Sequence, residues 1–396
     1  MTTHPFGAGN LPEPSAEAMA ISRHLHALIS ERIADAGGAI PFESYMNAVL
    51  NEPGFGYYAA NVRGFGPEAD FVTAPEVSGA FAHSVAHAIS PVLCELGADA
   101  GVLELGAGSG VLAERVLGSL AELSHLPPHY TILEPSPVLA AMQQERLEPL
   151  GRALNVSLHW LQRLPEPPLK GVILANEVVD AFPIERFQIT PDGPRALYVE
   201  VTDGAFKDVP GPQNLELARW VSALEARLGR PLPPGYVSER NRLADAWVAS
   251  LAQALCAGAA FVFDYGYEER DFYHPERVQG TLLCHYRHRA HSNPYMLPGL
   301  QDVTSSVDLS ALARAAAHAG FSVAGYTTQA WFLMGNDLEG WMSDATPGTP
   351  DYIARAGAVR TLTMPGEMGE RIKLMVLTKG IDDVLVEQTR DSRFRL

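Results

Sequence analysis

The stretch VLELGAGSGVLAERVL, Val102 to Leu117, decides the fold. It opens with an apolar run typical of a buried strand, and its last part places Leu112 and Val116 on one side of a helix. Between them stands GAGSG, Gly106 to Gly110. Glycines are needed where the chain turns with positive φ and where a ligand lies against bare backbone. The stretch therefore predicts a strand, a tight turn and a helix that together bind a cofactor.

The spacing of the glycines bears on which cofactor this is. A nicotinamide or flavin fingerprint reads G-x-G-x-x-G and aims a helix N-terminus at a pyrophosphate. Here Gly106, Gly108 and Gly110 follow a G-x-G-x-G pattern, with Glu104 two residues before it. A carboxylate repels a pyrophosphate but attracts an ammonium or a sulfonium, so we expect Glu104 and these glycines to bind S-adenosyl-L-methionine (SAM). A strand-edge acid with a structural role is the alternative for Glu104.

A second acid follows on the next predicted strand. TILEPS, Thr131 to Ser136, is a short β-rich run, and Glu134 lies 24 residues after Gly110 (134 − 110). An acid at this place holds the hydroxyls of a ribose. NAD and SAM sites share the feature, so Glu134 supports the fold without choosing the cofactor. A surface strand end is the alternative for Glu134.

Composition narrows the class of protein. The chain has 396 residues, 47% of them hydrophobic, and a formal net charge of −17, so we expect two or three domains and no nucleic-acid partner. Cys94, Cys256 and Cys284 form no CxxC pair, which predicts reduced thiols. The sequence has no long apolar run, and its first residues contain neither a signal-like stretch nor an arginine. We therefore expect a bacterial, cytoplasmic protein without a membrane span.

Strand-like runs alternate with helical patterns along much of the chain. This predicts an α/β fold with a doubly wound, mostly parallel, seven-stranded sheet, N-terminal helices and an inserted helical and hairpin cover. We expect Thr73 or Ser78 to cap a long helix before the glycine strand, with Pro75 in its first turn. The expected segments are a flexible N-terminus (1–15), an N-terminal helical segment (16–97), a core (98–380) with an insertion (184–257) and a substrate-covering loop (266–308), and a C-terminal tail (381–396).

Ligands of parallel sheets bind where the carboxyl ends of the strands meet. This rule brings together Glu104 and the glycines, Glu134, Asn176 with Glu177, and Asp264 with Tyr265. If Glu177 and Asp180 begin a short helix, their i, i+3 spacing points both carboxylates the same way. Such a pair can bind a guanidinium. Helix capping is the alternative role for both acids.

Methyl transfer from SAM needs positioning and charge handling rather than a metal or a covalent nucleophile. An arginine acceptor is cationic, with a pKa above about 12, and neighbouring carboxylates leave one of its nitrogens richer in electrons. His285, His288 and His291 fit no zinc template, so we expect a solvated or substrate-facing loop there and no metal. Trp160 is expected in the core, with stacking on an adenine as the alternative.

Taken together, several segments resemble the MidA-like methyltransferases. This family includes the mitochondrial assembly factor that methylates an arginine in a core subunit of respiratory complex I. The resemblance spans about Pro41 to Leu377, and its segments are PFESYMNAVLNEPGFGYY, DFVTAPEVS, LELGAGSG, ANEVVDAFPIERF, FVFDYGY, GTLLCHYRHRAHSNPYMLPGLQDVTSSVDLSAL and MPGEMGERIKLMVL.

The resemblance implies a Rossmann-like class I methyltransferase fold, with Gly106 and Gly108 in the glycine turn and Glu134 on the ribose. It also implies that Thr73, Pro75, Glu76 and Ser78 wall the SAM pocket, that Asn176, Glu177 and Asp180 lie near the transferred methyl, and that Asp302 belongs to a segment covering the acceptor. The sequence departs from the family at Ala69-Asp70-Phe71, commonly GDF, and at Ser109, which replaces an arginine.

The resulting hypothesis is a SAM-dependent methyltransferase acting on an arginine of a protein, linked to assembly of a respiratory complex. Asn176, Glu177 and Asp180 are its expected catalytic residues, and Tyr265 and Asp302 its expected substrate contacts. The alternatives are a SAM-binding assembly chaperone with little turnover, a small-molecule methyltransferase and a nicotinamide dehydrogenase. The acceptor, the number of methyl groups added and the oligomeric state stay open.

Overall fold

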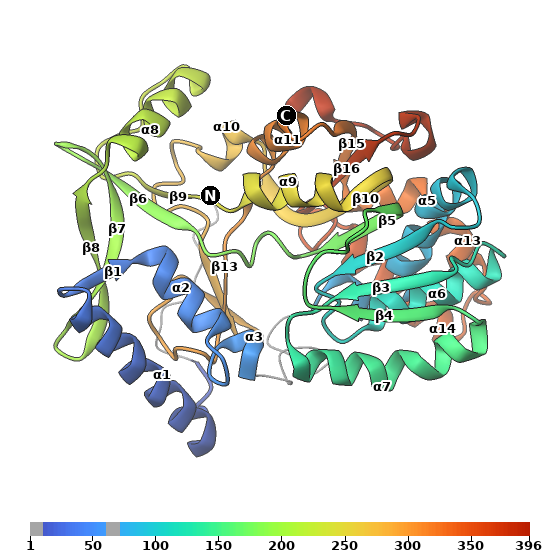
Figure 1. Cartoon of the computed structure of the whole chain (residues 1–396), viewed down its shortest axis with the longest axis horizontal. Helices are drawn as coiled ribbons and strands as arrows, with labels where there is room; N and C mark the ends of the chain where they lie inside the picture. The colour runs from blue at the N-terminus through green and yellow to red at the C-terminus, as the bar shows by residue number, and fades with distance from the viewer. Residues whose placement is uncertain (1–10, 61–71) are drawn as a thin grey trace. The chain divides into compact units, whose positions relative to one another are not determined.

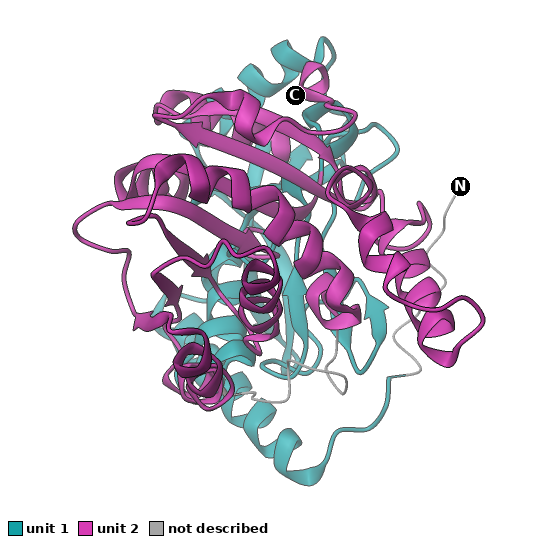
Figure 2. Cartoon of the chain, turned by 90° about the vertical axis from the view of Figure 1, so that its right-hand side faces the viewer, with its two compact units in different colours: residues 1–71, 180–243, 267–308 teal, residues 72–179, 244–266, 309–396 magenta. Residues whose placement is uncertain are grey.

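The computed structural model describes residues 11–60 and 72–396. The chain forms two compact units, each assembled from three segments (Figure 2). Unit 1 comprises residues 1–71, 180–243 and 267–308, and unit 2 comprises residues 72–179, 244–266 and 309–396. Among the described residues, no helix has the length and apolar character needed to cross a membrane.

A mostly parallel sheet forms the centre of unit 2 and confirms the predicted fold class. Within the described residues, seven strands of this sheet follow the spatial order β15-β16-β10-β5-β2-β3-β4 (Figure 1). The strands from β4 to β10 pair in parallel, whereas β16 and β15 run antiparallel to their neighbours. Their bounds are β2 Gly101–Leu105, β3 His129–Leu133, β4 Ser157–Leu161, β5 Leu169–Asn176, β10 Leu255–Tyr267, β15 Ser322–Thr328 and β16 Ile372–Lys379.

Helices precede or connect the strands of this sheet, because a parallel pair needs a crossover rather than a tight turn. They are α5 Gly79–Leu96, α6 Val111–Glu122, α7 Pro137–Leu154, α9 Ala244–Ala254 and α11 Leu309–His318. Helix α5 packs on α6, and α9 packs on α11. All five residues of β2 are buried, as expected of a strand in a sheet covered by helices.

A row of three glycines lies at the start of β2, β5 and β10. Gly171 pairs with Gly101 on one side and with Gly258 on the other. A β-carbon on Gly171 would lie 1.9 Å from the carbonyl oxygen of Gly101, and one on Gly258 would lie 1.7 Å from that of Gly171. The φ angles of Gly171 and Gly258 are +153° and +140°. These positions therefore admit no side chain.

The expected long helix before the glycine strand is divided in two. Thr73 is the N-cap residue of the short helix α4 (Ala74–Val77), which contains Pro75, but its side chain makes no capping bond. Ser78 caps α5 by accepting a hydrogen bond from the Ala80 N–H at 3.2 Å. Three further helices were not predicted, α12 (Gln329–Gly335), α13 (Leu338–Ser343) and α14 (Pro350–Thr363), and two 3-10 turns follow at Asp383–Val386 and Arg393–Arg395.

Unit 1 contains two antiparallel sheets. The larger has the order β1-β7-β6-β9, with β8 on β7, and the smaller has the order β12-β11-β13. The strands of these sheets are β1 Ala39–Pro41, β6 Glu185–Thr190, β7 Gly193–Thr202, β8 Ala205–Gln213, β9 Val237–Arg240, β11 Leu283–Tyr286, β12 Arg289–His291 and β13 Asp302–Thr304. The short strand β14, Val307–Asp308, belongs to neither sheet. The helices are α1 Ala16–Asp35, α2 Phe42–Asn51, α3 Tyr57–Ala60, α8 Leu215–Leu228 and α10 Glu269–Phe272.

One hydrophobic core in unit 1 unites segments that are distant in sequence. Leu25 of α1, Tyr45 of α2, Phe206 of β8 and Val303 of β13 all belong to it. The N-terminal helices thus share a core with the inserted hairpin and with the covering segment. A helix expected near Arg240 to Ala257 begins only at Ala244, because residues 237–240 form β9, and α9 belongs to unit 2.

Candidate functional site

The carboxyl ends of the parallel strands in unit 2 meet at one edge of the sheet. Leu105 at the end of β2 pairs with Leu133 and with Ala175, and Phe263 of β10 pairs with Asn176. The glycine turn and Glu134 directly follow β2 and β3, Asn176 ends β5 with Glu177 next to it, and Asp264 and Tyr265 lie in the last part of β10, so these residues come from one edge of the sheet, as predicted.

All three glycines of the turn adopt left-handed backbone conformations. Their φ angles are +61° for Gly106, +53° for Gly108 and +79° for Gly110, which is the N-cap residue of α6. The Gly106 N–H donates to the carbonyl of Leu133 at 3.1 Å, which ties the turn to the next strand. The glycines are present because the backbone needs these φ values and leaves the turn without side chains.

Gln143, on α7, connects the parts of the predicted ribose site. Its side-chain amide donates to the Gly108 carbonyl at 2.9 Å and to Glu134 Oε2 at 3.0 Å. Its own oxygen accepts from Trp160 Nε1 at 3.1 Å, and Trp160 packs on the core of unit 2 as expected. Glu134 Oε1 accepts the Ser136 N–H at 2.9 Å. Sequence reasoning missed Gln143, because a lone glutamine in an amphipathic helix carries no motif.

The two acids of the predicted cofactor site are both buried. Glu104 is 3% exposed and accepts the Tyr130 hydroxyl hydrogen at 2.6 Å. Burial raises the pKa of Glu104 to about 7, with a smaller contribution from the negative charge of Glu134. Burial also raises the pKa of Glu134, against its hydrogen bonds from Ser136 and Gln143. The carboxyl of Glu104 is therefore only partly ionised near neutral pH, whereas the sequence argument assumed a full charge.

The segment from Thr73 to Ser78 lies against the glycine turn. Ser109 donates its hydroxyl hydrogen to Glu76 Oε1, and Arg115 donates to the Pro75 carbonyl. Ser109, which stands in place of the family's arginine, thus binds α4 to the turn. The other departure from the family, at 69–71, lies outside the described residues.

The predicted helix after β5 is wrong. Glu177 follows the strand with a left-handed φ of +53°, and none of the described residues 177–184 is helical. The i, i+3 argument for Glu177 and Asp180 therefore fails. The boundary between the two units also falls here, since Val179 belongs to unit 2 and Asp180 to unit 1.

The turn that carries Glu177 is held from two sides. The Glu177 N–H donates to the Phe263 carbonyl at 2.8 Å, and its Oε1 accepts from the Asn176 amide at 3.2 Å. The fully buried Asp264 accepts the N–H groups of Val179 at 2.8 Å and Tyr265 at 2.9 Å. A non-glycine residue with positive φ persists only where its surroundings enforce it, and such residues cluster at functional sites.

Two of the predicted site residues at this edge, Asn176 and Tyr265, differ in their environments. The side-chain oxygen of Asn176 is buried without a hydrogen-bond partner among the described residues. Tyr265, a predicted substrate contact, is half-buried and packs against the core of unit 2. An unpaired buried acceptor is costly unless a donor reaches it, so Asn176 Oδ1 is available to an N–H or O–H of a bound molecule.

The other predicted acids gather in unit 1. Asp302 of β13 accepts the Tyr58 hydroxyl hydrogen at 2.8 Å, and the Asp180 carbonyl accepts the Ser305 N–H at 3.0 Å. Burial raises the pKa of Tyr58 well above its ordinary value, and the charges of Asp302 and Asp180 raise it further. Asp180 and Asp302 therefore lie near one tyrosine, Tyr58, which sequence reasoning missed.

The three histidines of the covering segment differ in environment. His285 of β11 pairs in register with Asp302, and burial, followed by the charge of His291, lowers the pKa of His285 to about 4. His288 is exposed in the turn between β11 and β12, with a φ of +61°. His291 is buried. His285 is thus a neutral side chain beside a predicted substrate contact.

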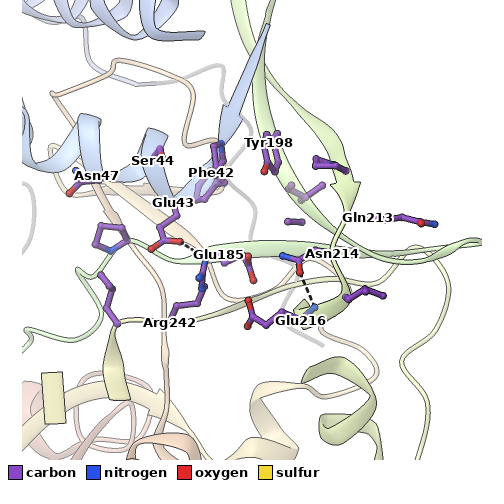
Figure 3. Close-up of a pocket in the computed structure, with 17 residues that line it drawn as sticks. Phe42, Glu43, Ser44, Asn47, Glu185, Tyr198, Gln213, Asn214, Glu216 and Arg242 are labelled. Atoms are coloured by element: carbon purple, nitrogen blue, oxygen red, sulfur yellow. Dashed lines mark hydrogen bonds and ion pairs between the residues drawn. The ribbon is translucent and has the colours of Figure 1, made fainter. Parts of the chain in front are cut away.

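Unit 1 also contains a cavity of about 790 Å³ (Figure 3). Phe42, Glu43 and Asn47 line it from α2, and Tyr198 lines it from β7. Arg242 lies 3.6 Å from Glu43 and 3.7 Å from Glu185, so it balances part of the acidic charge on the wall of the cavity. The predicted site residues, all within the described ranges, do not line this cavity.

Comparison with known proteins identifies relatives over most of the chain. The model of a family of S-adenosyl-L-methionine-dependent methyltransferases matches residues 84–327. The Drosophila melanogaster protein arginine methyltransferase NDUFAF7 homolog, mitochondrial, is 28% identical over 93% of this chain and 88% of its own length. The Homo sapiens protein arginine methyltransferase NDUFAF7, mitochondrial, is 28% identical over 78% of this chain and 72% of its own length.

Two solved structures are similar to this chain over nearly its whole length. A protein from Burkholderia thailandensis that is described as a likely methyl transferase, bound to S-adenosyl-homocysteine, is 37% identical with a TM-score of 0.91. The match covers 98% of this chain and 100% of that one. A native structure of a superfamily protein from the same organism is also 37% identical, with a TM-score of 0.87.

The residues at the sheet edge of unit 2 fit an adenosyl group. Glu134 is oriented by Ser136 and Gln143 at the position where an acid accepts ribose hydroxyls. The left-handed turn at Gly106 and Gly108 offers bare backbone rather than a pyrophosphate-binding G-x-G-x-x-G loop. The unpaired oxygen of Asn176 adds an acceptor at the same edge.

Proposed function

The chain belongs to the S-adenosyl-L-methionine-dependent methyltransferase family and takes SAM as its cofactor, and from this premise we propose that it methylates an arginine side chain of a protein during assembly of a respiratory complex. The observation that carries this proposal is the extent of the likeness to the protein arginine methyltransferases. The match to the Drosophila melanogaster relative extends over 93% of the chain, and so includes much of unit 1 as well as the sheet of unit 2.

Methyl transfer to an arginine side chain requires carboxylates near the acceptor guanidinium. SAM supplies an electrophilic methyl group whose leaving group is a neutral thioether. The acceptor guanidinium is a cation and therefore a poor nucleophile. A carboxylate that accepts two of its N–H groups holds the positive charge on those two nitrogens, so the third nitrogen is richer in electrons and a better nucleophile. With SAM bound, that nitrogen would take the methyl group as the carbon–sulfur bond breaks, and a carboxylate would accept its proton and pass it to solvent.

Glu177 is the proposed catalytic carboxylate of unit 2. Its backbone is fixed by Phe263, and Asp264 holds the following residues of the turn. Asn176 orients its side chain and keeps a second oxygen for a donor. Within unit 1, Asp180 is a further proposed catalytic acid, and Asp302, which accepts the Tyr58 hydroxyl hydrogen, is a proposed substrate contact. Tyr265 is the proposed apolar contact of the substrate.

The proposal is tested by transfer of labelled methyl from SAM to proteins in an extract of the source organism that lacks this gene, followed by hydrolysis. We expect label in methylarginine on one protein band. Glu177→Gln should bind SAM like the native protein but transfer methyl at least about 100-fold more slowly. Glu145→Gln, an exposed acid on α7 in the same unit, is the matched control and should transfer at the native rate.

Other outcomes separate the alternatives. Label in a small molecule, with none in protein, would indicate a small-molecule methyltransferase. No label in any product, from a preparation that binds SAM, would favour an assembly chaperone with little turnover. Unchanged transfer by Glu177→Gln would remove this carboxylate from the mechanism and leave the family assignment intact.

A further inference from the structure

Two histidines and an aspartate of unit 2 converge away from the sheet edge described above. His83 and His87 are four residues apart on α5, a spacing that places both side chains on the same face of a helix. Asp337 immediately precedes α13. Its Oδ2 lies 3.2 Å from His83 Nε2 and 3.4 Å from His87 Nε2. All three possible ligand atoms lie within 4.8 Å of one another.

We propose that His83, His87 and Asp337 form a binding site for a divalent transition-metal ion of the zinc class. In a tetrahedral site with bonds of about 2.0 to 2.2 Å, neighbouring ligand atoms are about 3.4 Å apart. The two nitrogen-to-oxygen distances match that edge. The two imidazole nitrogens lie within 4.8 Å of each other, so the third edge needs at most a small rotation of the imidazole rings to admit the ion.

The conformation of Asp337 supports the assignment independently. An aspartate that begins a helix ordinarily accepts a hydrogen bond from a backbone N–H of the first turn. Asp337 makes no such capping bond, has a left-handed φ of +59°, and directs its carboxylate to the two imidazoles instead. Gly340 leaves room for this, since a β-carbon there would lie 2.3 Å from Asp337 Oδ2.

The ligand chemistry narrows the choice of ion. Imidazole nitrogens suit Zn²⁺, Co²⁺, Ni²⁺ and Cu²⁺, whereas Ca²⁺ and Mg²⁺ prefer all-oxygen sites. The side chains of His83, His87 and Asp337 are 14%, 27% and 47% exposed, so an ion reaches them from solvent and a water completes its coordination. The expectation of no metal rested on the histidines at 285–291, whose spacing fits no zinc template, and did not concern these three residues.

A bound ion would join α13 to α5. Helix α5 begins directly after Ser78, at the end of the segment that packs on the glycine turn through Glu76. The ion therefore stiffens a helix next to the cofactor site without contacting the reacting groups. This inference does not depend on the acceptor proposed above.

The full-length protein, stripped of metal with a chelator, is titrated with Co²⁺ and followed by visible absorption and calorimetry. We expect one equivalent to bind, with the intense visible bands of a tetrahedral site, and Zn²⁺ to abolish those bands by displacement. His87→Gln and Asp337→Asn should each weaken binding at least tenfold. His318→Gln, an exposed histidine on α11 of the same unit, is the matched control and should bind as the native protein does.

The metal-free variants are compared with the native protein by circular dichroism and SAM affinity, so that misfolding is not mistaken for ligand loss. If His87→Gln is misfolded, Asp337→Asn, which keeps the shape of the side chain, decides the question. Equal Co²⁺ affinity in native protein and folded variants, or no binding by the native protein at micromolar Co²⁺, would overturn the proposal. A cluster joined only by hydrogen bonds would give the second result.

Discussion

The stability of the folded protein is expected to depend on pH through Glu104, whose side chain is buried in unit 2. Its ordinary pKa is 4.5, and burial raises it to about 7 in the folded protein. Between these values the folded protein holds a proton that the unfolded chain has released, so stability falls as pH rises from about 4.5 to above 7. The two pKa values differ by an amount that corresponds to about 3 kcal/mol in the free energy of unfolding.

Glu104→Gln tests this, because glutamine cannot titrate yet still accepts the Tyr130 hydrogen bond. We expect the native free energy of unfolding, relative to that of the variant, to fall by about 3 kcal/mol across this pH window. Urea unfolding of cofactor-free protein at a series of pH values measures it. Glu145→Gln is the exposed control. Parallel stability curves for native protein and Glu104→Gln would contradict the raised pKa.

Gln143 is predicted to matter for cofactor binding although it need not contact the cofactor. Gln143→Leu keeps the volume of the side chain but removes its bonds to the Gly108 carbonyl, Glu134 and Trp160. A hydrogen bond to a charged group contributes about 1.5 to 3 kcal/mol, so SAM affinity should fall about tenfold or more. Calorimetry measures the change, and the half-buried Gln144→Leu is its neighbour and control. Equal affinities in the two variants would show that the network does not orient Glu134.

At the scale of elements, the glycine row fixes how closely β2, β5 and β10 approach. Gly171→Ala should lower the free energy of unfolding by several kcal/mol or prevent folding, since the new methyl would overlap the Gly101 carbonyl. Gly118→Ala is the matched control. Nothing lies within 4 Å of a β-carbon at Gly118 in α6, where alanine should stabilise by about 0.5 to 1 kcal/mol. The soluble yield and the free energy of unfolding in urea are measured for both variants. A Gly171→Ala variant with native yield and native stability would contradict the close contact.

The elements predictable from sequence are those whose burial is local and periodic. Strand β2 is an apolar run, and α6 shows a clear apolar face, so both were expected. Helix α14 buries only Leu362 among its residues and gives no such signal. The turn at Glu177 was mistaken for a helix because its conformation depends on Asp264, which accepts the N–H of Val179 from 85 positions further along the sequence. Long-range hydrogen bonds of this kind, like those of Gln143 and Tyr58, leave no trace in local spacing.

The charge of the whole molecule bears on the proposed substrate. The net charge of −17 favours encounter with a basic protein segment, and salt screens that attraction. Raising ionic strength from about 0.01 M to about 0.15 M shortens the Debye length from about 30 Å to about 8 Å. KM for an arginine-bearing protein substrate should therefore rise severalfold. The affinity for SAM, measured at the same salt concentrations, is the control. A KM that does not change with salt concentration would argue against electrostatic attraction of a protein acceptor.

The assembly of each unit from three separate segments has a consequence for synthesis on the ribosome. Ala39 of β1 pairs with Glu200 of β7, a residue made 161 positions later (200 − 39). Likewise β16, inside the sheet between β15 and β10, ends at Lys379. Neither unit acquires all its strands until distant parts of the chain have emerged. The nascent chain must therefore carry exposed apolar helices for most of its translation, and it depends on late segments to cover them.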